Sequence, residues 1–396
     1  MIVGAGPAGL VLALQLARGG VEVVLLDMGK TVDYRPRAAH YASPAALELQ
    51  KAGVLDDVKA RGFQPDQFCW RRFNGEWIVG IDNRVVKDDP LRMVVLPLGM
   101  LGELLLEHAA KYPNITIHWS HEVVAIDQDD NKARAVARTE EGSERTFEGD
   151  YVVGCDGANS KVRRALFGDW NYPGKTWDEW VVATNVLRFC VALIQVYYPF
   201  EKFGYVDSNF IIDPEHWYMA AKITNDGLWR VSYGELPGLT PEEIIKRQPW
   251  KYQTMLPGNP TEKDYKLVNV SPYKMHQRCA DRFRIGRFLL AADAAHLCNP
   301  FGGLGLTGGM VDAGNLADCL IGVSNGWIDE SILDKYDEIR RKMWHETIDP
   351  ISSANLQRMH PPNLDHVMED PFFKELAKAE KDPEYMKEMV NVSLLF

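Results

Sequence analysis

The chain has 396 residues, of which 46% are hydrophobic and 25% are charged, an ordinary composition for a globular protein with room for two domains. Its formal net charge of -11 argues against a nucleic acid as the main partner, because no basic excess exists to neutralise phosphates. The six cysteines form no Cys-x-x-Cys pair and no apolar run is long enough to cross a bilayer, so we expect free thiols, a cytoplasmic location, no membrane span and no metal site.

The first predicted element is a short strand, residues 1–3, which leads into the turn GAGPAG and a helix. Gly4, Gly6 and Gly9 have the spacing Gly-x-Gly-x-x-Gly. In such a motif the first glycine allows a tight turn, the second lets the backbone approach a pyrophosphate, and the third lets the helix pack closely on the sheet. The second strand ends in Asp27, where an acid would meet an adenosine ribose. This context predicts a dinucleotide site, although the turn alone does not separate FAD from NAD.

Alternating helix and strand patterns continue to residue 167. One predicted helix follows Ser43, its expected N-cap, and stops at Gly53. From residue 168 aromatic residues become frequent, and TNDG at 224–227 is a strong hairpin signal between two strands. We therefore expect residues 168–280 to form an antiparallel sheet inserted into an α/β frame, with mostly helices after residue 310.

A second candidate ligand site lies in YVVGCDGANSKVRRAL, residues 151–166. Asp156 and Gly157 follow a buried strand, and Asn159 or Ser160 would cap the helix that comes next. An Asp-Gly pair at this place is often only a turn. It is also where open α/β sheets bind ligands, at the carboxyl ends of their strands.

A third motif, LLAADAAHLCNPFGGLGLTGG, covers residues 289–309. A strand is followed by Asp293, by Pro300 and by several glycines, and we expect a helix to begin near Thr307. The glycines let backbone N–H groups come close, and the positive end of the helix would point at the turn. This combination predicts a polar cradle for a flat ring.

Together, GAGPAG, CDGANSKVRRAL and AADAAHLCNPFGGLGLTGG resemble, in order and spacing, the single-component FAD-dependent aromatic hydroxylases with the para-hydroxybenzoate hydroxylase fold. The resemblance covers residues 1–348. PRAAHYASPAALELQKAGVLDDV looks like the fungal secondary-metabolite and phenol-degrading branches of these flavin monooxygenases.

The resemblance implies cofactor contacts along the chain. The first turn would hold the FAD pyrophosphate, Asp27 the adenosine ribose, Asp293 the ribityl chain and the third turn the isoalloxazine ring. Arg37 would contact the FAD, and the Asp-Gly pair would serve both FAD and the nicotinamide nucleotide. The implied cofactor-binding residues are Gly4, Gly6, Pro7, Ala8, Gly9, Asp27, Arg37, Asp156, Gly157, Asp293, Pro300, Gly302, Gly303, Leu304, Gly305 and Leu306.

Three residues depart from the family pattern. Ala292 replaces the glycine before the motif acid, Leu98 replaces a frequent glutamine, and Thr307 replaces an asparagine late in the glycine loop. Ala292 adds a methyl group where the backbone approaches the FAD, whereas Thr307 is still expected to cap the helix.

The resemblance implies an enzyme that uses NADPH or NADH and O2 to hydroxylate a small aromatic or heteroaromatic substrate through a C4a-hydroperoxyflavin. A phenol reacts best when deprotonated, and its free pKa is about 10, so a base or hydrogen-bonding group should lie near it. The candidate catalytic residues are His216, Tyr218, Arg230, Tyr233 and Pro300. His40 and Tyr41 are weaker candidates, and His296 is expected to be a hydrogen-bonding residue.

By strand alternation Arg230 shares a face with Ser232 and not with Tyr233. Two alternatives stay open: an epoxidase or dearomatising hydroxylase with the same fold, and a non-oxygenating FAD-binding protein. The charged tail leaves a homodimer open as well.

The expected fold is α/β: a Rossmann-like FAD-binding domain with an inserted antiparallel β-sheet substrate domain and a helical C-terminal segment. We assign residues 1–68, 92–167 and 281–346 to the FAD-binding domain, 69–91 and 168–280 to the substrate domain, and 347–396 to the tail.

Overall fold

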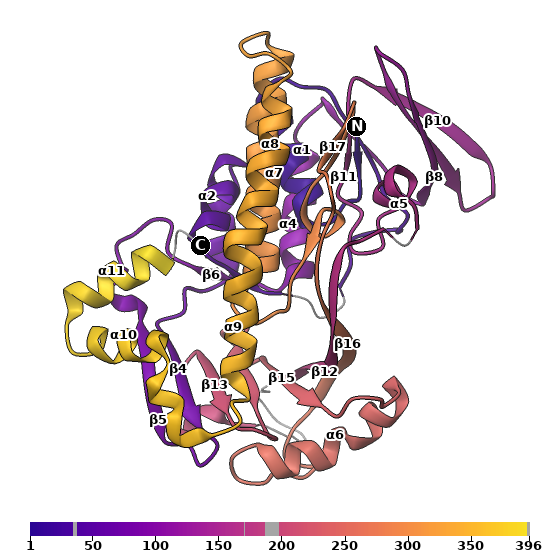
Figure 1. Ribbon diagram of the computed structural model, residues 1–396. Coiled ribbons are helices and arrows are strands. Elements are labelled where there is room, and N and C mark those ends of the chain that lie inside the picture. Colours follow the sequence, from indigo (N-terminus) through magenta and orange to yellow (C-terminus); the bar gives the residue numbers. More distant parts are fainter. Residues whose placement is uncertain (35–37, 170, 187–197, 394–396) are drawn as a thin grey trace.

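The structure is a computed structural model that describes residues 1–34, 38–169, 171–186 and 198–393 (Figure 1). Arg37, a predicted FAD contact, lies outside these residues. Two large sheets dominate the molecule, with helices beside the first and on both faces of the second.

The first sheet is parallel apart from one edge strand, and it collects strands from the start, the middle and the end of the chain. The four central strands are short apolar runs that are almost wholly buried, as expected for a parallel sheet, whereas the two edge strands are more exposed. Their order across the sheet is β17 (Arg284–Ile285), β18 (Phe288–Leu290), β11 (Val152–Gly154), β1 (Ile2–Val3), β2 (Val23–Leu26) and β7 (Ile115–His118).

Helix α1 (Pro7–Arg18) packs against α7 (Leu304–Ser324) and α4 (Leu98–Ala109), so the two glycine turns introduce neighbouring helices of one core. Ten of the twelve residues of α1 are buried, which explains why it is apolar on nearly all sides. The remaining helices of this part are α2 (Ser43–Lys51), α3 (Leu55–Arg61), α5 (Lys161–Phe167) and α8 (Ile332–Met343).

Two smaller sheets complete the α/β part. An antiparallel meander contains β8 (His121–Gln128), β9 (Ala133–Thr139) and β10 (Glu144–Gly149). The pair β3 (His40–Tyr41) and β6 (Val94–Val95) lies toward the second large sheet, because Ala39 and Val95 pack against Ile223.

The second large sheet has eight strands, antiparallel except where β13 meets β4. The hairpin predicted at 224–227 joins β14 to β15 and is confirmed. The order is β19 (His296–Leu297), β16 (Leu267–Cys279), β12 (Gly174–Val186), β15 (Trp229–Glu235), β14 (Tyr218–Lys222), β13 (Ser208–Ile212), β4 (Gln67–Arg72) and β5 (Trp77–Asp82).

Helix α6 (Pro241–Met255) covers one face of the eight-stranded sheet, and α9 (Asp349–Met359) runs onto the other face (Figure 1). The tail forms the helix pair α10 (Pro371–Ala379) and α11 (Pro383–Ser393), which packs on β4 and β5. Short turns of helix occur at Asn83–Val86, Phe200–Phe203, Ala292–Ala294, Trp344–Ile348 and Leu364–Glu369.

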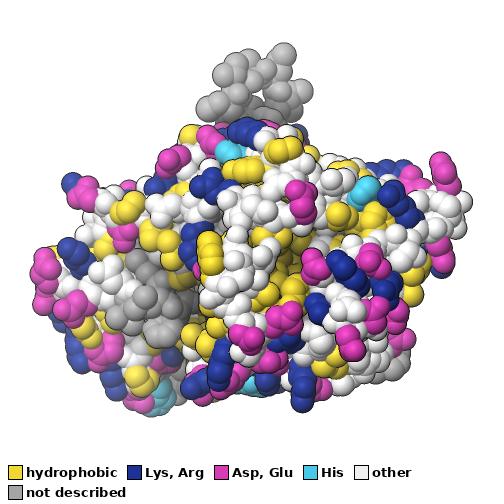
Figure 2. Space-filling model, turned by 90° about the horizontal axis from the view of Figure 1, so that it is seen from above, with side chains coloured by type: hydrophobic (Ala, Val, Ile, Leu, Met, Phe, Trp, Pro, Cys, Tyr) yellow, Lys and Arg dark blue, Asp and Glu magenta, His cyan; other side chains and the backbone are white. Residues whose placement is uncertain are grey.

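The predicted α/β fold with an antiparallel sheet and a helical C-terminal segment is confirmed. The domain boundaries stay a prediction, which the entry of β4 and β5 into the large sheet supports. In the described part of the chain no helix is long and apolar enough to cross a bilayer. Figure 2 shows Lys and Arg side chains interspersed with Asp and Glu on the face seen from above.

One predicted helix cap is wrong. Helix α2 starts at Ser43 itself, and the extended residue before it, Ala42, occupies the N-cap position. The Ser43 hydroxyl is therefore buried inside the first turn, where it makes no hydrogen bond with a described residue.

Candidate functional site

The first glycine turn combines two crowded positions with one open position. Gly4 has a φ of +106°, and a Cβ there would clash with the carbonyl oxygen of Cys155. A Cβ on Gly9 would clash with the carbonyl oxygen of Gly4. Gly6, in contrast, faces space that holds no heavy atom within 4 Å of an added Cβ. Because α1 starts here without a side-chain cap, its N–H groups are accessible to an anion from the open side.

Asp27 lies beside this turn at the end of β2. Its Oδ2 accepts a hydrogen bond of 2.6 Å from the N–H of Ala5, and its Oδ1 accepts one of 2.7 Å from the N–H of Gly29. The carboxylate is half-buried and retains lone pairs for further donors such as sugar hydroxyls.

Asp156 joins the same edge, because a Cβ on Gly4 would lie 2.9 Å from the Cα of Asp156. Its carboxylate accepts hydrogen bonds from the Ser160 hydroxyl and from the N–H groups of Lys161 and Val162, at 2.6, 2.6 and 3.2 Å. Burial raises the pKa of this carboxyl above its ordinary value. Ser160 is the N-cap of α5, one of the two residues predicted for that role.

The turn of the third motif starts at Ala292, just after β18. Ala292 has a φ of +56°, in the left-handed region that favours glycine. The next residue, Asp293, is exposed, and its backbone oxygen accepts a 3.1 Å hydrogen bond from the Tyr172 hydroxyl. The Arg163 guanidinium lies 3.6 Å from the centre of the Tyr172 ring and donates to the Ala294 oxygen, so Arg163 and Tyr172 hold this turn from the middle of the chain.

The glycine loop ends earlier than the sequence predicts. Gly302 and Gly303 have φ values of +112° and +69°, and α7 begins directly after them at Leu304 rather than near Thr307. Thr307 is buried within the first turns of the helix, so its predicted capping role is wrong. The two consecutive left-handed glycines turn the chain directly into the helix. Gly303 therefore occupies the N-cap position in place of Thr307. Gly303 faces open space at the uncapped N-terminus of α7.

A buried network of charged side chains, centred on Asp312 of α7, holds the turn of the third motif in place. The Asp312 carboxylate accepts hydrogen bonds from the Ala292 N–H, the His296 Nε2 and the Arg340 Nε, at 3.0, 2.7 and 2.6 Å. Burial acts to raise the pKa of Asp312, but His296 and Arg340 outweigh it and hold the pKa below its ordinary value. The prediction that His296 is a hydrogen-bonding residue is confirmed.

The loop is also attached to the eight-stranded sheet. Gln277 on β16 accepts hydrogen bonds from the backbone and side-chain N–H groups of Asn299, just before Pro300. Its own amide donates to Asp349 Oδ1 at 2.6 Å and to the Ser352 hydroxyl at 3.0 Å. Next to Pro300, the ring of Phe301 packs edge-on against Trp217, with 5.3 Å between centroids. We call residues 299–303 the flavin loop, and this loop therefore lies directly against the sheet face that α6 does not cover.

The candidate catalytic residues lie in different places. Tyr218 and Tyr233 face each other across β14 and β15 within the apolar cluster under α6, and the Tyr218 hydroxyl hydrogen-bonds to that of Tyr205. Burial raises the pKa of both tyrosines. His216 is half-buried next to Phe73, with 5.5 Å between ring centroids.

Arg230 lies on the opposite face, as alternation predicts, opposite Ala221 on β14. It is only 8% exposed, and burial lowers its pKa to about 10. Of the residues proposed for catalysis, Arg230 lies on the sheet face that meets the flavin loop and Pro300 belongs to the loop, whereas Tyr218 and Tyr233 lie on the other face.

Asp312, Gln277 and Asn299 are site residues that sequence reasoning missed. One acid inside the apolar helix MVDAGNLADCLIG was a usable signal for Asp312. Nothing in the local sequence distinguishes Gln277 from any other polar residue of a strand, because its partners lie more than twenty residues away.

The residues present fit FAD. Gly6 and Gly303 leave open space at two uncapped helix N-termini, which offer N–H groups to a pyrophosphate and to the electron-rich edge of a flavin.

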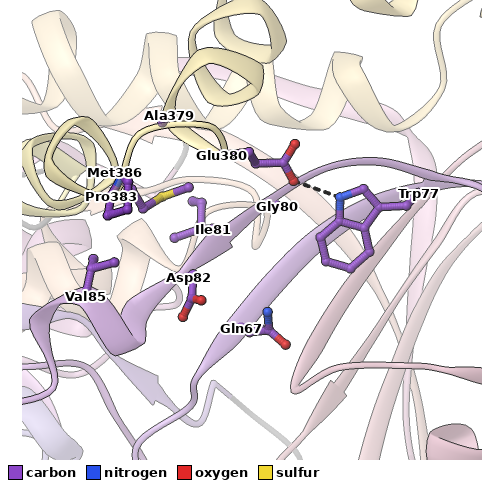
Figure 3. Close-up of a pocket in the computed structure, with 10 residues that line it drawn as sticks. All are labelled: Gln67, Trp77, Gly80, Ile81, Asp82, Val85, Ala379, Glu380, Pro383 and Met386. Carbon is purple, nitrogen blue, oxygen red and sulfur yellow. Dashed lines mark hydrogen bonds between the residues drawn. The ribbon is translucent and has the colours of Figure 1, made fainter.

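A cavity of about 390 Å³ lies away from this site, between β5 and the tail helices (Figure 3). There the Trp77 indole donates a 2.8 Å hydrogen bond to Glu380. In the described part of the chain no three His, Cys, Asp or Glu side chains are grouped to hold a metal ion.

Proteins of known activity are similar to this chain over nearly its whole length. The family described as "FAD binding domain" matches residues 1–350. Para-nitrophenol 4-monooxygenase of Pseudomonas sp. (strain WBC-3) is 37% identical over 378 residues, which are 95% of this chain and 91% of that protein. The 6-hydroxy-3-succinoylpyridine 3-monooxygenase HspB of Pseudomonas putida is 37% identical over 362 residues, which are 91% of this chain and 88% of that protein.

A solved structure has the same architecture. The crystal structure of p-nitrophenol 4-monooxygenase PnpA from Pseudomonas putida superposes with a TM-score of 0.90 at 37% identity, over 99% of this chain and 97% of that one. The chain therefore belongs to the FAD-binding family that its three motifs resemble, and it is an FAD-dependent aromatic monooxygenase.

Proposed function

We propose that this monooxygenase hydroxylates a small phenol or hydroxypyridine, with NAD(P)H as the electron donor and O2 as the oxygen donor. The observation that carries the proposal is the direct contact between the flavin loop and the aromatic-lined sheet face, through Phe301 and Trp217. The names of the two relatives, a nitrophenol and a hydroxypyridine monooxygenase, support this substrate class.

We propose the following roles for the cofactor-binding residues. Gly4, Gly6 and Gly9, with Pro7 and Ala8 at the start of α1, bind the pyrophosphate. Asp27 binds the adenosine ribose, Asp293 the ribityl chain, and Arg37 a further part of the FAD. Asp156 and Gly157 contact FAD and the nicotinamide nucleotide. The isoalloxazine contacts are Pro300, Gly302, Gly303, Leu304, Gly305 and Leu306, a set supported by the open space at Gly303.

FAD, when bound, supplies the redox chemistry, because it carries electrons from NAD(P)H to O2. The protein holds the ring and keeps water away from it. The positive end of α7 stabilises negative charge on the reduced ring. Trp217, Met275 and Phe301 form one buried cluster with Leu356 and Met359 of α9, and this cluster closes one side of the reaction site to water. Arg230 provides a positive charge on the same sheet face.

We do not propose substrate contacts for Tyr218 and Tyr233, since both pack beneath α6. His216 lies just before β14 and packs beside Phe73, and we propose it for a substrate contact only after Arg230.

A substrate-dependent oxidation assay tests the function. We expect purified protein to be yellow, to oxidise NADPH or NADH faster when a phenol such as 4-nitrophenol is added, and to place one oxygen atom from ¹⁸O-labelled O2 in the product. A colourless protein that does not take up FAD, or a nucleotide oxidation that no aromatic compound stimulates, would contradict the proposal. The product structure also separates ring hydroxylation from epoxidation or dearomatisation.

We further propose that the enzyme acts in the cytoplasm as a homodimer. The free thiols of the described cysteines support the location. Exposed Ile339 and Met343 on α8 support a contact between copies. Light scattering should then give twice the 44.8 kDa mass of one chain, and a mass of one chain would contradict the dimer.

A further inference from the structure

A side chain of helix α9 occupies the space beside Gly302 of the flavin loop. Gly302 has a φ of +112°, and a Cβ added there would lie 2.8 Å from the Nδ2 atom of Asn355. On the same helix, Leu356 and Met359 belong to the buried cluster that contains Phe301. Helix α9 therefore packs along the loop through one polar side chain, Asn355, and through an apolar surface.

Arg358 fixes the orientation of the Asn355 amide. The Nη1 atom of Arg358 donates a hydrogen bond of 2.9 Å to the Oδ1 atom of Asn355. Because a guanidinium has no acceptor, the amide oxygen must face Arg358 and the amide nitrogen must face Gly302. Without this hydrogen bond the amide would be free to rotate and to place a different atom against the loop.

Arg358 is held in turn by the first residues of the tail helix α10. Its Nε atom donates a hydrogen bond of 2.9 Å to Oδ2 of Asp370, in an ion pair whose side chains are 20% and 28% exposed. The Oδ1 atom of Asp370 accepts the N–H of Phe372 at 2.8 Å, so Asp370 is also the N-cap of α10. The guanidinium carbon lies 4.7 Å from the centre of the Phe372 ring. The start of α10 thus determines where the Arg358 guanidinium lies.

The start of α10 rests on the substrate sheet. The ring of Phe372 meets Trp70 edge-on, with 5.2 Å between centroids, and Trp70 stacks on Phe210 at 5.1 Å. Phe210 packs against the cluster that contains Phe301 of the flavin loop. Tail, sheet and loop therefore form a closed ring of contacts, in which Arg358 has no free end to move toward.

We infer that Arg358 is a positioning residue for the flavin. Through Asn355 it connects the N-cap of α10 to Gly302 and holds the flavin loop against the isoalloxazine ring. The inference rests on the proposed contact between this loop and the flavin, and it gives the tail, residues 347–396, a part in the reaction. If the connection is lost, the loop shifts, and fewer flavin turnovers give an oxygenated product.

Two single variants and their combination test the inference. Arg358→Met removes the guanidinium, whereas Asn355→Ala removes the amide and leaves the ion pair of Arg358 with Asp370 intact. We expect each variant to lower the product formed per NAD(P)H oxidised about threefold to tenfold, with the substrate KM within about twofold of wild type. Each should also change the visible circular dichroism of bound FAD. The double variant should lose no more coupling than a single variant, because both residues act in one connection.

Arg341→Met is the matched control. Arg341 forms an ion pair with Asp337 on α8, with side chains that are 32% and 13% exposed, and among the described residues this pair does not involve the flavin loop. The variant should lower the temperature of unfolding much as Arg358→Met does, yet keep the coupling and the visible circular dichroism of the wild type. A purely structural role of Arg358 would move only the unfolding temperature.

The inference is overturned if Arg358→Met keeps the coupling and the visible circular dichroism of the wild type, or if the losses of the two single variants multiply in the double variant. Failure of the proposed function has a different result. In that case no aromatic compound is oxygenated, and the visible circular dichroism of bound FAD in the same variants still supports or overturns the inference.

Discussion

Ala292 stands where the motif pattern predicts a glycine, and its backbone has a conformation that favours glycine. A φ of +56° costs a residue with a side chain about 1 to 2 kcal/mol. The methyl group also limits the packing of α7, because a Cβ on Gly309 would lie 2.7 Å from that of Ala292. The alanine is tolerated since the Asp312 carboxylate accepts a hydrogen bond from its N–H and fixes the turn.

Replacing Ala292 with glycine should therefore keep or strengthen FAD binding. Relief of strain is offset in part by the greater freedom of glycine in the unfolded chain, so we expect the free energy of unfolding to change by less than about 1 kcal/mol. Titration of apoprotein with FAD, followed by flavin fluorescence, measures the affinity. Ala295→Gly is a matched control, because Ala295 has an ordinary φ of -91° and gains no relief. Clearly weaker FAD binding by Ala292→Gly would show that this backbone is placed differently.

The Asp312 network makes a prediction about stability and pH. Asp312→Asn leaves the buried Arg340 without its counter-charge, which should lower the free energy of unfolding by about 3 to 5 kcal/mol. The folded pKa of Asp312 is lowered, so its contribution is complete above its unfolded pKa of about 4 and is lost as the pH falls further. Urea unfolding between pH 3 and pH 7 should thus show a smaller loss of stability at acid pH in the variant than in the wild type.

An exposed ion pair on the neighbouring helix serves as the control for Asp312. Lys335 and Glu338 are 63% and 62% exposed, and Glu338→Gln should change stability by less than about 1 kcal/mol. If Asp312→Asn lowers the free energy of unfolding no more than Glu338→Gln does, the Asp312 network does not stabilise the turn at Ala292.

At the scale of elements, the sequence predicts strands and helices well where the pattern is local. The hairpin at 224–227 and the alternation that separates Arg230 from Tyr233 follow from the period of a strand and the Asp-Gly turn. Which of the two faces meets the flavin loop depends on α6 and α9, and no local pattern contains that information. The start of α7 was placed too late for a similar reason, because the left-handed φ of Gly302 and Gly303 is a property of the folded loop.

The tail helices provide a prediction at this scale. Phe373 of α10 is 2% exposed and packs with Val79 and Ile212 of the eight-stranded sheet. Phe373→Ala should lower the free energy of unfolding by about 3 to 5 kcal/mol, since the cavity remains, yet leave the affinity for FAD unchanged. Thermal unfolding and an FAD titration measure the two effects. Phe73→Ala, at a residue that is 38% exposed, should cost much less. Equal losses in both variants would mean that the tail does not cover this sheet face.

Considered as a whole, the molecule joins distant parts of the chain at one loop. The motifs near Gly4, Asp156 and Asp293 could be predicted because each is a strand followed by a turn, and the first sheet brings their strands together. The attachment of the flavin loop to the substrate sheet could not be predicted. Nothing in the local sequence distinguishes Gln277, Asn299 and Asp349 from other polar residues, and only the folded chain brings them together. Gln277 and Asn299 are each 1% exposed, so every lost hydrogen bond there leaves a buried polar group unsatisfied.

Gln277→Met should consequently loosen the flavin loop from the sheet without removing any group that touches the substrate. Misplacement of reacting groups by about 1 Å costs up to about a hundredfold in rate, so we expect kcat to fall about tenfold to hundredfold, with less product formed per NAD(P)H consumed. Gln248→Met is the matched control, because Gln248 is 2% exposed but belongs to α6 on the other side of the sheet, where its amide meets the Tyr265 hydroxyl. Both variants should lose stability, and only Gln277→Met should lose coupling, measured as product against nucleotide oxidised. Equal coupling in the two variants would show that the contact between loop and sheet stabilises the fold but does not position the reaction.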